Sequence, residues 1–332
     1  MFVKRDLRKI PEILSACLPN NDDDDETKNE IATTTGGGVL KELRLARRPA
    51  EFNGTISILC QPQLAPALTH LQALSLYDCN ISNLDGIGFF GSPPPLETDT
   101  SNQSGNSCCC PNLMELNLGR NPLTKLPSEL SLLKGSLKIL WCDDCNLSGP
   151  LPDCLYELDK LETLRMTNNK ISELSNTKIQ KWKHSMKVLS LDGNELVHLP
   201  LEMTNLTTLN TLLLRNNKLK SLPEGLPGPS MSNLSFFHIS SNELTSLPTS
   251  IIHCTSLEKV YLNGNKISNL PPGFAKQLSK LSHLNLTNNS ISEDLPQDFT
   301  NRFGFPDKHS GQCTKVSTAI TPSPFLFSHT PL

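Results

Sequence analysis

LNTLLLRNNKLKSLP, residues 209–223, is the stretch that decides the fold of this chain. Apolar residues occupy its positions 1, 4, 6 and 11, an asparagine occupies position 9, and Leu-Pro ends it. The pattern L-x-x-L-x-L-x-x-(N/C)-x-(L/I) occurs nine times along the 332 residues and predicts a repeat architecture. The nine copies begin at Leu71, Leu113, Leu137, Leu161, Met186, Leu209, Leu234, Leu257 and Leu281.

The copies are almost evenly spaced. Position 9 recurs every 23 to 25 residues, except for a first interval of 42 residues that contains an insertion at about residues 91–109. One copy cannot bury its leucines alone, so neighbouring copies must stack and share a core. Positions 4 and 6 should point inward, and positions 3, 5 and 7 should be exposed. We therefore expect an α/β solenoid, curved as a right-handed horseshoe, with a parallel β-sheet on the concave face and short helices or turns on the convex face.

Position 9 lies where the chain leaves each strand and turns. An asparagine side chain there can donate to and accept from backbone groups that would otherwise be buried without partners. A cysteine fits the same space and donates weakly through its thiol. We predict a structural ladder formed by Cys79, Asn121, Cys145, Asn169, Asn194, Asn217, Asn242, Asn265 and Asn289.

With its Leu-Pro ending, the repeat resembles that of the intracellular Ras-group-related leucine-rich-repeat proteins. Residues 209–223 and 257–271 are closest to that template, whereas NLSGPLP at residues 146–152 is similar to a plant-specific repeat class. The resemblance covers about residues 71–296. It implies a scaffold that binds a protein partner on its concave face, without catalysis and without a cofactor.

The exposed strand positions are where we expect binding, because Trp, Tyr and Arg dominate the binding energy of protein interfaces. An alternative is that the aromatic side chains only pack against their neighbours across the strands. The predicted partner-binding residues are Trp141, Arg165, Leu213, Arg215, Phe236, His238, Tyr261 and Lys259.

Four regions are expected along the chain. Residues 1–38 should form a short N-terminal helix and an acidic, glycine-rich linker, and residues 39–70 a degenerate N-terminal repeat or cap. Residues 71–300 form the repeat domain, with its inserted loop. Residues 301–332 should cap the open end, since an uncovered last repeat would expose leucines.

Composition limits the choice of partner. The formal net charge of −3 argues against nucleic-acid binding, and no uninterrupted apolar stretch is long enough to span a membrane. The first residues lack the apolar core of a secretory signal, so we expect a cytoplasmic protein with reduced cysteines, and a monomer. Cys108–Cys110 lacks the spacing of a zinc site, and no metal is expected.

Two other functions remain open. The chain could be the recognition part of a receptor or of a ubiquitin-ligase adaptor whose effector domain is elsewhere. The segment Trp141–Cys145 has the W-C-x-x-C form of a thiol redox motif, with Cys142 and Cys145 as its thiols. Because Cys142 falls on inward position 6 and Cys145 on position 9, we expect both to be structural.

Overall fold

The computed structural model describes residues 32–35, 39–47, 52–60, 64–91, 110–291 and 299–301. The predicted N-terminal helix and linker, the inserted loop and the C-terminal cap lie almost wholly outside these residues. The chain divides into two compact units. Among the described residues, unit 1 contains those up to Leu147 and residues 152–161, and unit 2 contains residues 148–151 and those from Glu162 onward.

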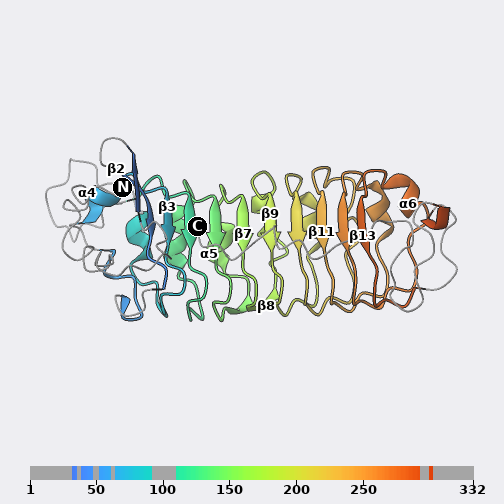
Figure 1. The fold of residues 1–332 in the computed structure, drawn as a ribbon, viewed down its shortest axis with the longest axis horizontal. Coiled ribbons are helices and arrows are strands. Elements are labelled where there is room, and N and C mark those ends of the chain that lie inside the picture. Colours follow the sequence, from blue (N-terminus) through green and yellow to red (C-terminus); the bar gives the residue numbers. More distant parts are fainter. Residues whose placement is uncertain are drawn as a thin grey trace, which may run out of the picture. The chain divides into compact units, whose positions relative to one another are not determined.

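Unit 1 begins with β1 (Ala32–Thr35), which pairs antiparallel with β2 (Val39–Arg44). The strand β2 begins at residue 39, the residue from which the sequence predicts a degenerate first repeat. Parallel pairing then continues in chain order from β2 to β5 (Figure 1). The other elements are β3 (Ala73–Ser75), β4 (Glu115–Asn117), β5 (Ile139–Trp141), α4 (Ala65–Leu68), η2 (Ile87–Phe90), η3 (Ser128–Leu133) and α5 (Asp153–Tyr156).

Unit 2 contains a parallel sheet whose strands again follow chain order, and a separate two-stranded pair of β6 (Ser148–Pro150) with β8 (Lys170–Glu173) (Figure 1). The sheet strands are β7 (Thr163–Arg165), β9 (Val188–Ser190), β10 (Thr211–Leu213), β11 (Phe236–His238), β12 (Lys259–Tyr261) and β13 (His283–Asn285). The short helices are η4 (Ile179–Trp182), η5 (Leu201–Asn205), η6 (Thr249–His253) and α6 (Phe274–Gln277).

The strand register agrees with the repeat. Nine parallel strands each cover positions 3 to 5 of their copy: β3, β4, β5, β7, β9, β10, β11, β12 and β13. Side chains at positions 4 and 6 are no more than 3% exposed, and Cys142 and Leu214 are fully buried. The alternation of a strand therefore sends the repeated leucines into the core and leaves positions 3, 5 and 7 on the other side of the sheet.

Six of the position-9 asparagines make the backbone hydrogen bonds expected of the predicted ladder. The Asn217 amide donates to the carbonyls of Leu191 (2.9 Å) and Leu214 (3.1 Å), and its Oδ1 accepts from the backbone N–H of Leu196 (3.0 Å). The asparagines at 121, 194, 242, 265 and 289 make equivalent bonds. Each of these six asparagines thus joins its own repeat to the preceding one.

Cysteine performs only part of this role. The thiol of Cys145 donates to the Leu118 carbonyl at 3.2 Å, as an asparagine amide would. Cysteine has no side-chain oxygen to accept a hydrogen bond as the asparagine Oδ1 does. The N–H of Leu123, which corresponds to that of Leu196 beside Asn217, instead donates to the Cys145 backbone carbonyl at 3.1 Å. Cys79 donates in the same way to the Leu45 carbonyl, at 2.7 Å.

The segments that follow the strands are short helices and turns. Proline is the residue that precedes four of these helices, as expected from its fixed φ and missing N–H. These residues are Pro127, Pro152, Pro200 and Pro248. Within the described residues, no helix is long and apolar enough to cross a membrane.

Candidate protein-binding surface

We call the side chains at positions 3, 5 and 7 of the parallel strands the strand face of each unit. The middle column, position 5, is less exposed than the sequence predicts. Leu213 was predicted to contact a partner, but it is only 5% exposed. Its register partners are Ser190 and His238 on the neighbouring strands. At about 4.8 Å from each strand, a mid-column side chain lies between its neighbours, and Leu213 therefore extends the core rather than the binding surface.

Three aromatic side chains from two adjacent strands form the centre of the unit 2 strand face. The Phe236 and Tyr261 ring centroids lie 5.5 Å apart, those of His238 and Tyr261 5.1 Å apart, and those of Phe236 and His238 6.3 Å apart. We call these residues the aromatic cluster. The rings pack laterally, as the alternative interpretation expected, but each remains partly exposed. The cluster is therefore rigid and still accessible, which suits a contact site.

His238 behaves as a neutral ring within the cluster. Its Nε2 lies 2.7 Å from the Ser240 hydroxyl. Burial, and to a lesser extent the positive charge of Arg215, lowers the pKa of His238 from 6.5 to about 4. At neutral pH the imidazole is uncharged, so it adds aromatic surface rather than positive charge.

The charges of the unit 2 strand face are mostly positive. Arg165 stands at position 5, Arg215 at position 7 and Lys259 at position 3 of their copies. The single carboxylate in these positions is that of Asp192. Asp192 is engaged with the backbone, since its Oδ1 accepts from the Arg215 N–H at 2.6 Å. The Arg215 side chain is exposed, and Arg165 and Lys259 are partly exposed.

The strand face of unit 1 differs. Trp141 is partly exposed there, as predicted. Among the described residues, no second aromatic ring packs against it. Burial first, and the negative charge of Glu42 second, raise the pKa of Glu115. Arg44 forms an ion pair with Glu42 at 3.1 Å. Unit 1 therefore presents Trp141 and Tyr77, whose rings are not in contact with each other, beside charges that are mostly acidic.

One contact in unit 1 was missed by sequence reasoning. The guanidinium of Arg120 lies 5.5 Å from the centre of the Tyr77 ring, a cation–π geometry. Arg120 stands at position 8, where its φ of 57° is left-handed. All nine residues at position 8 have positive φ, and most are Asn, Asp or Gly. That preference was the available signal that position 8 turns away from the strand and can return its side chain to the face.

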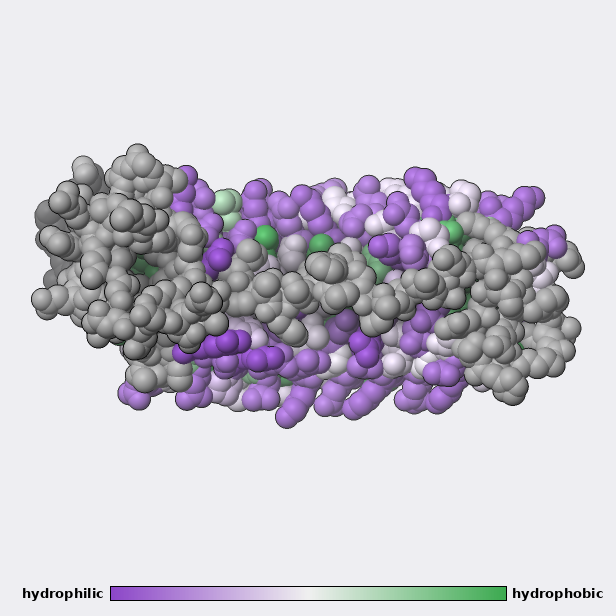
Figure 2. Space-filling model, viewed as in Figure 1, coloured by the Kyte–Doolittle hydropathy of each residue, from purple (hydrophilic) through white to green (hydrophobic). Residues whose placement is uncertain are grey.

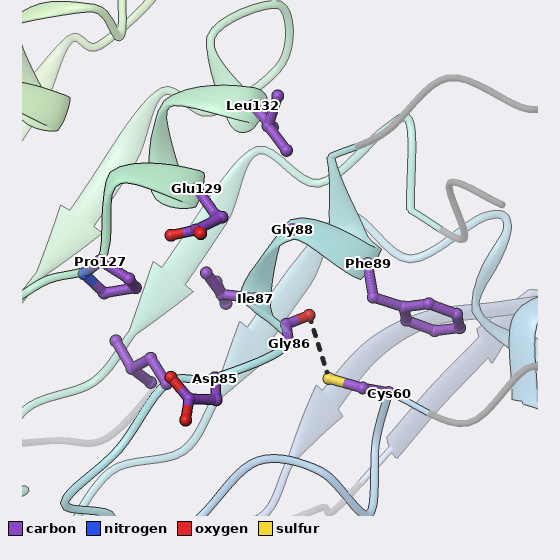
Figure 3. Close-up of a pocket in the computed structure, with 10 residues that line it drawn as sticks. Cys60, Asp85, Gly86, Ile87, Gly88, Phe89, Pro127, Glu129 and Leu132 are labelled. Atoms are coloured by element: carbon purple, nitrogen blue, oxygen red, sulfur yellow. Dashed lines mark hydrogen bonds between the residues drawn. The ribbon is translucent and has the colours of Figure 1, made fainter. Parts of the chain in front are cut away.

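A pocket in unit 1 lies away from the strand face (Figure 3). It has a volume of about 430 Å³ and is lined by segments around η2 and η3, including Asp85, Phe89, Glu129 and Leu132. The Cys60 thiol lines it and donates to the Gly86 carbonyl at 3.2 Å. The described lining contains no histidine, lysine or arginine that would stabilise a thiolate, so the pocket does not resemble a cysteine active site.

The W-C-x-x-C segment does not have the environment of a redox pair. Cys142 and Cys145 are fully buried, and neither is part of a disulfide. The hydrogen bond between the Cys142 thiol and the Cys145 sulfur first, and burial second, raise the pKa of Cys142 well above its usual value. Redox cysteines need the opposite shift and access to substrate. The described residues also contain no group of three side chains suited to hold a metal ion.

Most other described surface is hydrophilic (Figure 2). Among the described residues, the exposed large hydrophobic side chains are Leu132 and Leu201, on η3 and η5. They are single residues on the outer helices, a common feature of soluble surfaces. The partly exposed aromatic cluster is therefore the larger apolar feature and the leading candidate for binding.

Comparison with known proteins agrees with the fold. A family model described as leucine rich repeat matches residues 207–267 and 255–301, and a second of the same description matches residues 136–158. The chain is similar to the leucine-rich-repeat ectodomain of the plant membrane receptor kinase GASSHO1/SCHENGEN3 from Arabidopsis thaliana, solved in complex with CASPARIAN STRIP INTEGRITY FACTOR 2. The identity is 26% and the TM-score 0.59, over 75% of this chain and 30% of that one.

Two further structures share the fold. The Arabidopsis receptor kinase HAESA, in complex with the peptide hormone IDA and the co-receptor SERK1, is 22% identical with a TM-score of 0.63, over 86% of this chain and 46% of that one. An internalin from Listeria monocytogenes is 24% identical with a TM-score of 0.57, over 75% of this chain and 61% of that one. The chain thus spans less than two thirds of the length of each of these three.

The stacked repeats, the asparagine ladder and the parallel strands define the class of α/β repeat solenoids. Together with the family-model matches over residues 136–158 and 207–301, they give this chain the fold of a leucine-rich-repeat solenoid. Such folds typically serve as interaction modules without catalysis, and their function depends on the residues of the strand face.

Proposed function

We propose that this protein is a non-catalytic scaffold that binds a protein partner on its strand face. The observation that carries the proposal is the aromatic cluster of Phe236, His238 and Tyr261, three partly exposed rings held in contact on adjacent strands. Rigid aromatic side chains lose little conformational entropy on binding and bury a large area. The proteins of similar fold that were solved with a peptide or protein partner support this role.

The proposal includes an intracellular signalling role, close to the Ras-group-related leucine-rich-repeat proteins. The Leu-Pro template of residues 209–223 and 257–271 supports it. So do the seven described cysteines, all of which are free thiols and six of which are buried. Free thiols in such number are typical of a reducing compartment. Imaging of the tagged protein in its own cells tests the location: cytoplasmic signal is expected, and signal confined to the secretory route would contradict it.

Affinity capture with matched variants tests the binding role. Bait proteins would be the wild type, Phe236→Ala with Tyr261→Ala, Trp141→Ala, and Leu201→Ala as control. Leu201 lies on η5, away from the strand face, and is 58% exposed. We expect specific partners, identified by mass spectrometry, to be retained by the wild type and the control and lost with the aromatic double variant. Equal recovery by the double variant and the wild type would reject the strand face as the binding surface.

A second function is favoured by one observation. The receptor ectodomains of similar fold are longer than this chain, which spans 30% and 46% of those two structures. The protein would then be the recognition part of a receptor or of a ubiquitin-ligase adaptor. Sequencing of full-length transcripts tests this function: a kinase, F-box or membrane segment joined to these repeats would support it, and transcripts that encode only the repeats would reject it.

A further inference from the structure

The charges around the aromatic cluster indicate which kind of partner fits it. Lys259 lies in register beside Phe236, and Arg215 is close enough to His238 to affect its titration. Within the described residues, neither Arg215 nor Lys259 forms an ion pair. Three flanking lysines differ, because each pairs with a glutamate: Lys187 with Glu162 (2.6 Å), Lys218 with Glu195 (2.9 Å) and Lys266 with Glu243 (3.1 Å).

Positive charge therefore exceeds negative charge beside the cluster, where neither Arg215 nor Lys259 shares an ion pair with a described carboxylate. The only carboxylate at positions 3, 5 and 7 of this unit, that of Asp192, accepts from the backbone N–H of Arg215. Glu258 stands at position 2, outside these columns. Cations gathered beside an apolar surface favour a partner of complementary charge, which gains specificity and a faster association rate.

We infer that the unit 2 strand face binds an acidic peptide segment of the partner, with an apolar side chain on the aromatic cluster and carboxylates against Arg215 and Lys259. This inference rests on the proposed function and specifies its partner. The guanidinium of Arg215 has the planar donor pair that matches a carboxylate, whereas the Lys259 ammonium acts as a compact charge.

The geometry also limits the spacing within that segment. Arg215 follows β10, and Lys259 and Tyr261 lie on β12, two strands away. Parallel strands are about 4.8 Å apart and residues about 3.3 Å apart along a strand, so Arg215, two strands and two positions from Tyr261, lies roughly 12 Å from it, a distance that three to four residues of an extended peptide cover. An Asp or Glu should therefore stand within about three to four residues of the apolar anchor.

Selection from a displayed library of random dodecapeptides tests this inference. Baits are the full chain, an Arg215→Ala/Lys259→Ala double variant, and a Lys218→Ala/Lys266→Ala control that removes the same charge away from the strand face. All four side chains are at least partly exposed, and circular dichroism would verify that each variant is folded. We expect the wild type and the control to enrich peptides with Asp or Glu near a large apolar residue, and the double variant to lose only the acidic preference.

The contribution of Arg215 and Lys259 to binding is measured from the affinity of the protein for one enriched, fluorescently labelled peptide. Its Kd should rise about tenfold in the Arg215/Lys259 double variant, should change less than about twofold in the control, and should weaken with added salt. Enrichment of basic or uncharged peptides, no enrichment at all, or an acidic preference that survives in the double variant would overturn the inference. Tighter binding of a labelled single-stranded RNA, lost in the same variant, would overturn it as well.

The two proposals can fail separately. If partner capture depends on Phe236 and Tyr261 but the library shows no acidic preference, the scaffold function stands and the inference about the partner is wrong. If partner capture does not depend on these residues, the scaffold function on this face is wrong, whatever the library enriches.

Discussion

At position 9, unit 2 carries asparagine in all six of its copies, whereas unit 1 carries cysteine in two of three. The strand faces differ as well. At positions 3, 5 and 7, unit 1 presents Glu42, Glu115 and Asp143 against Arg44, while unit 2 presents three cations against one carboxylate. The two units thus share one backbone template but differ in how firmly repeats are joined and in what their faces can bind.

The largest difference we expect within this comparison is in thiol reactivity. Unit 1 contains six of the seven described cysteines, and only Cys60 among the seven is partly exposed. Timed alkylation of the native protein, followed by mass spectrometry, should modify Cys60 about 10³ times faster than Cys142 or Cys145, because buried thiols react only after local opening. In unit 2, burial raises the pKa of Cys254 to about 12, so it should be equally slow.

Rapid modification of Cys142 in the folded protein would contradict this prediction. It would also restore the thiol redox interpretation of the W-C-x-x-C segment.

The second prediction concerns the ladder. Asn217→Ala removes a side chain that bonds three buried backbone groups and should lower the free energy of unfolding by about 3 kcal/mol. Cys145→Ala in unit 1 should cost about 1 kcal/mol, since the thiol is a weak donor and the N–H of Leu123 already bonds a backbone carbonyl. Urea denaturation measures both values, and equal losses would show that the two residue types are interchangeable.

The third prediction compares the strand faces. Tyr261→Ala should weaken binding of a captured partner by about 2 kcal/mol, because it removes one ring and frees the two that pack against it. Trp141→Ala in unit 1 should weaken binding less, since no aromatic ring among the described residues packs against Trp141. Titration calorimetry with the purified partner gives both values. A larger loss from Trp141→Ala would move the main contact to unit 1.

The smallest effect is a pH dependence specific to unit 2. The pKa of His238 is about 4 when folded, against 6.5 in the unfolded chain, so below pH 6.5 the unfolded state binds a proton that the folded state does not. Stability should fall between pH 6.5 and pH 4, by an amount on the order of 1 kcal/mol at pH 5.5. His238→Gln should lack this contribution. Denaturation of both proteins across this range tests it, and parallel curves would contradict it.

Much of the fold could be predicted because the same sequence pattern occurs nine times. Val260 and Leu262 alternate with the partly exposed Lys259, Tyr261 and Asn263, and the same spacing of buried residues at every copy placed all nine strands. The ladder could be predicted from the chemistry of Asn217 and its equivalents. An amide that recurs where the chain leaves each strand can bond the backbone groups that are buried there. The division into two units was not expected, because the spacing of position 9 does not change at residues 161–162.

The site was harder to predict, because exposure depends on neighbours from other strands. The sequence placed Phe236, His238 and Tyr261 on the strand face, but it could not show that Leu213 lies buried between Ser190 and His238. Nor could it show the neutral state of His238, which follows from burial. The Arg120–Tyr77 contact depends on the left-handed turn at position 8, outside the columns considered.

Photocrosslinking tests the binding surface most directly. A benzoylphenylalanine side chain would replace Tyr261 on the unit 2 strand face, or Leu201 on η5, in two otherwise identical proteins expressed in the native cells. We expect irradiation to link a partner protein to position 261 and not to position 201. Crosslinking at 201 with none at 261 would contradict the central claim that this protein binds through its strand face.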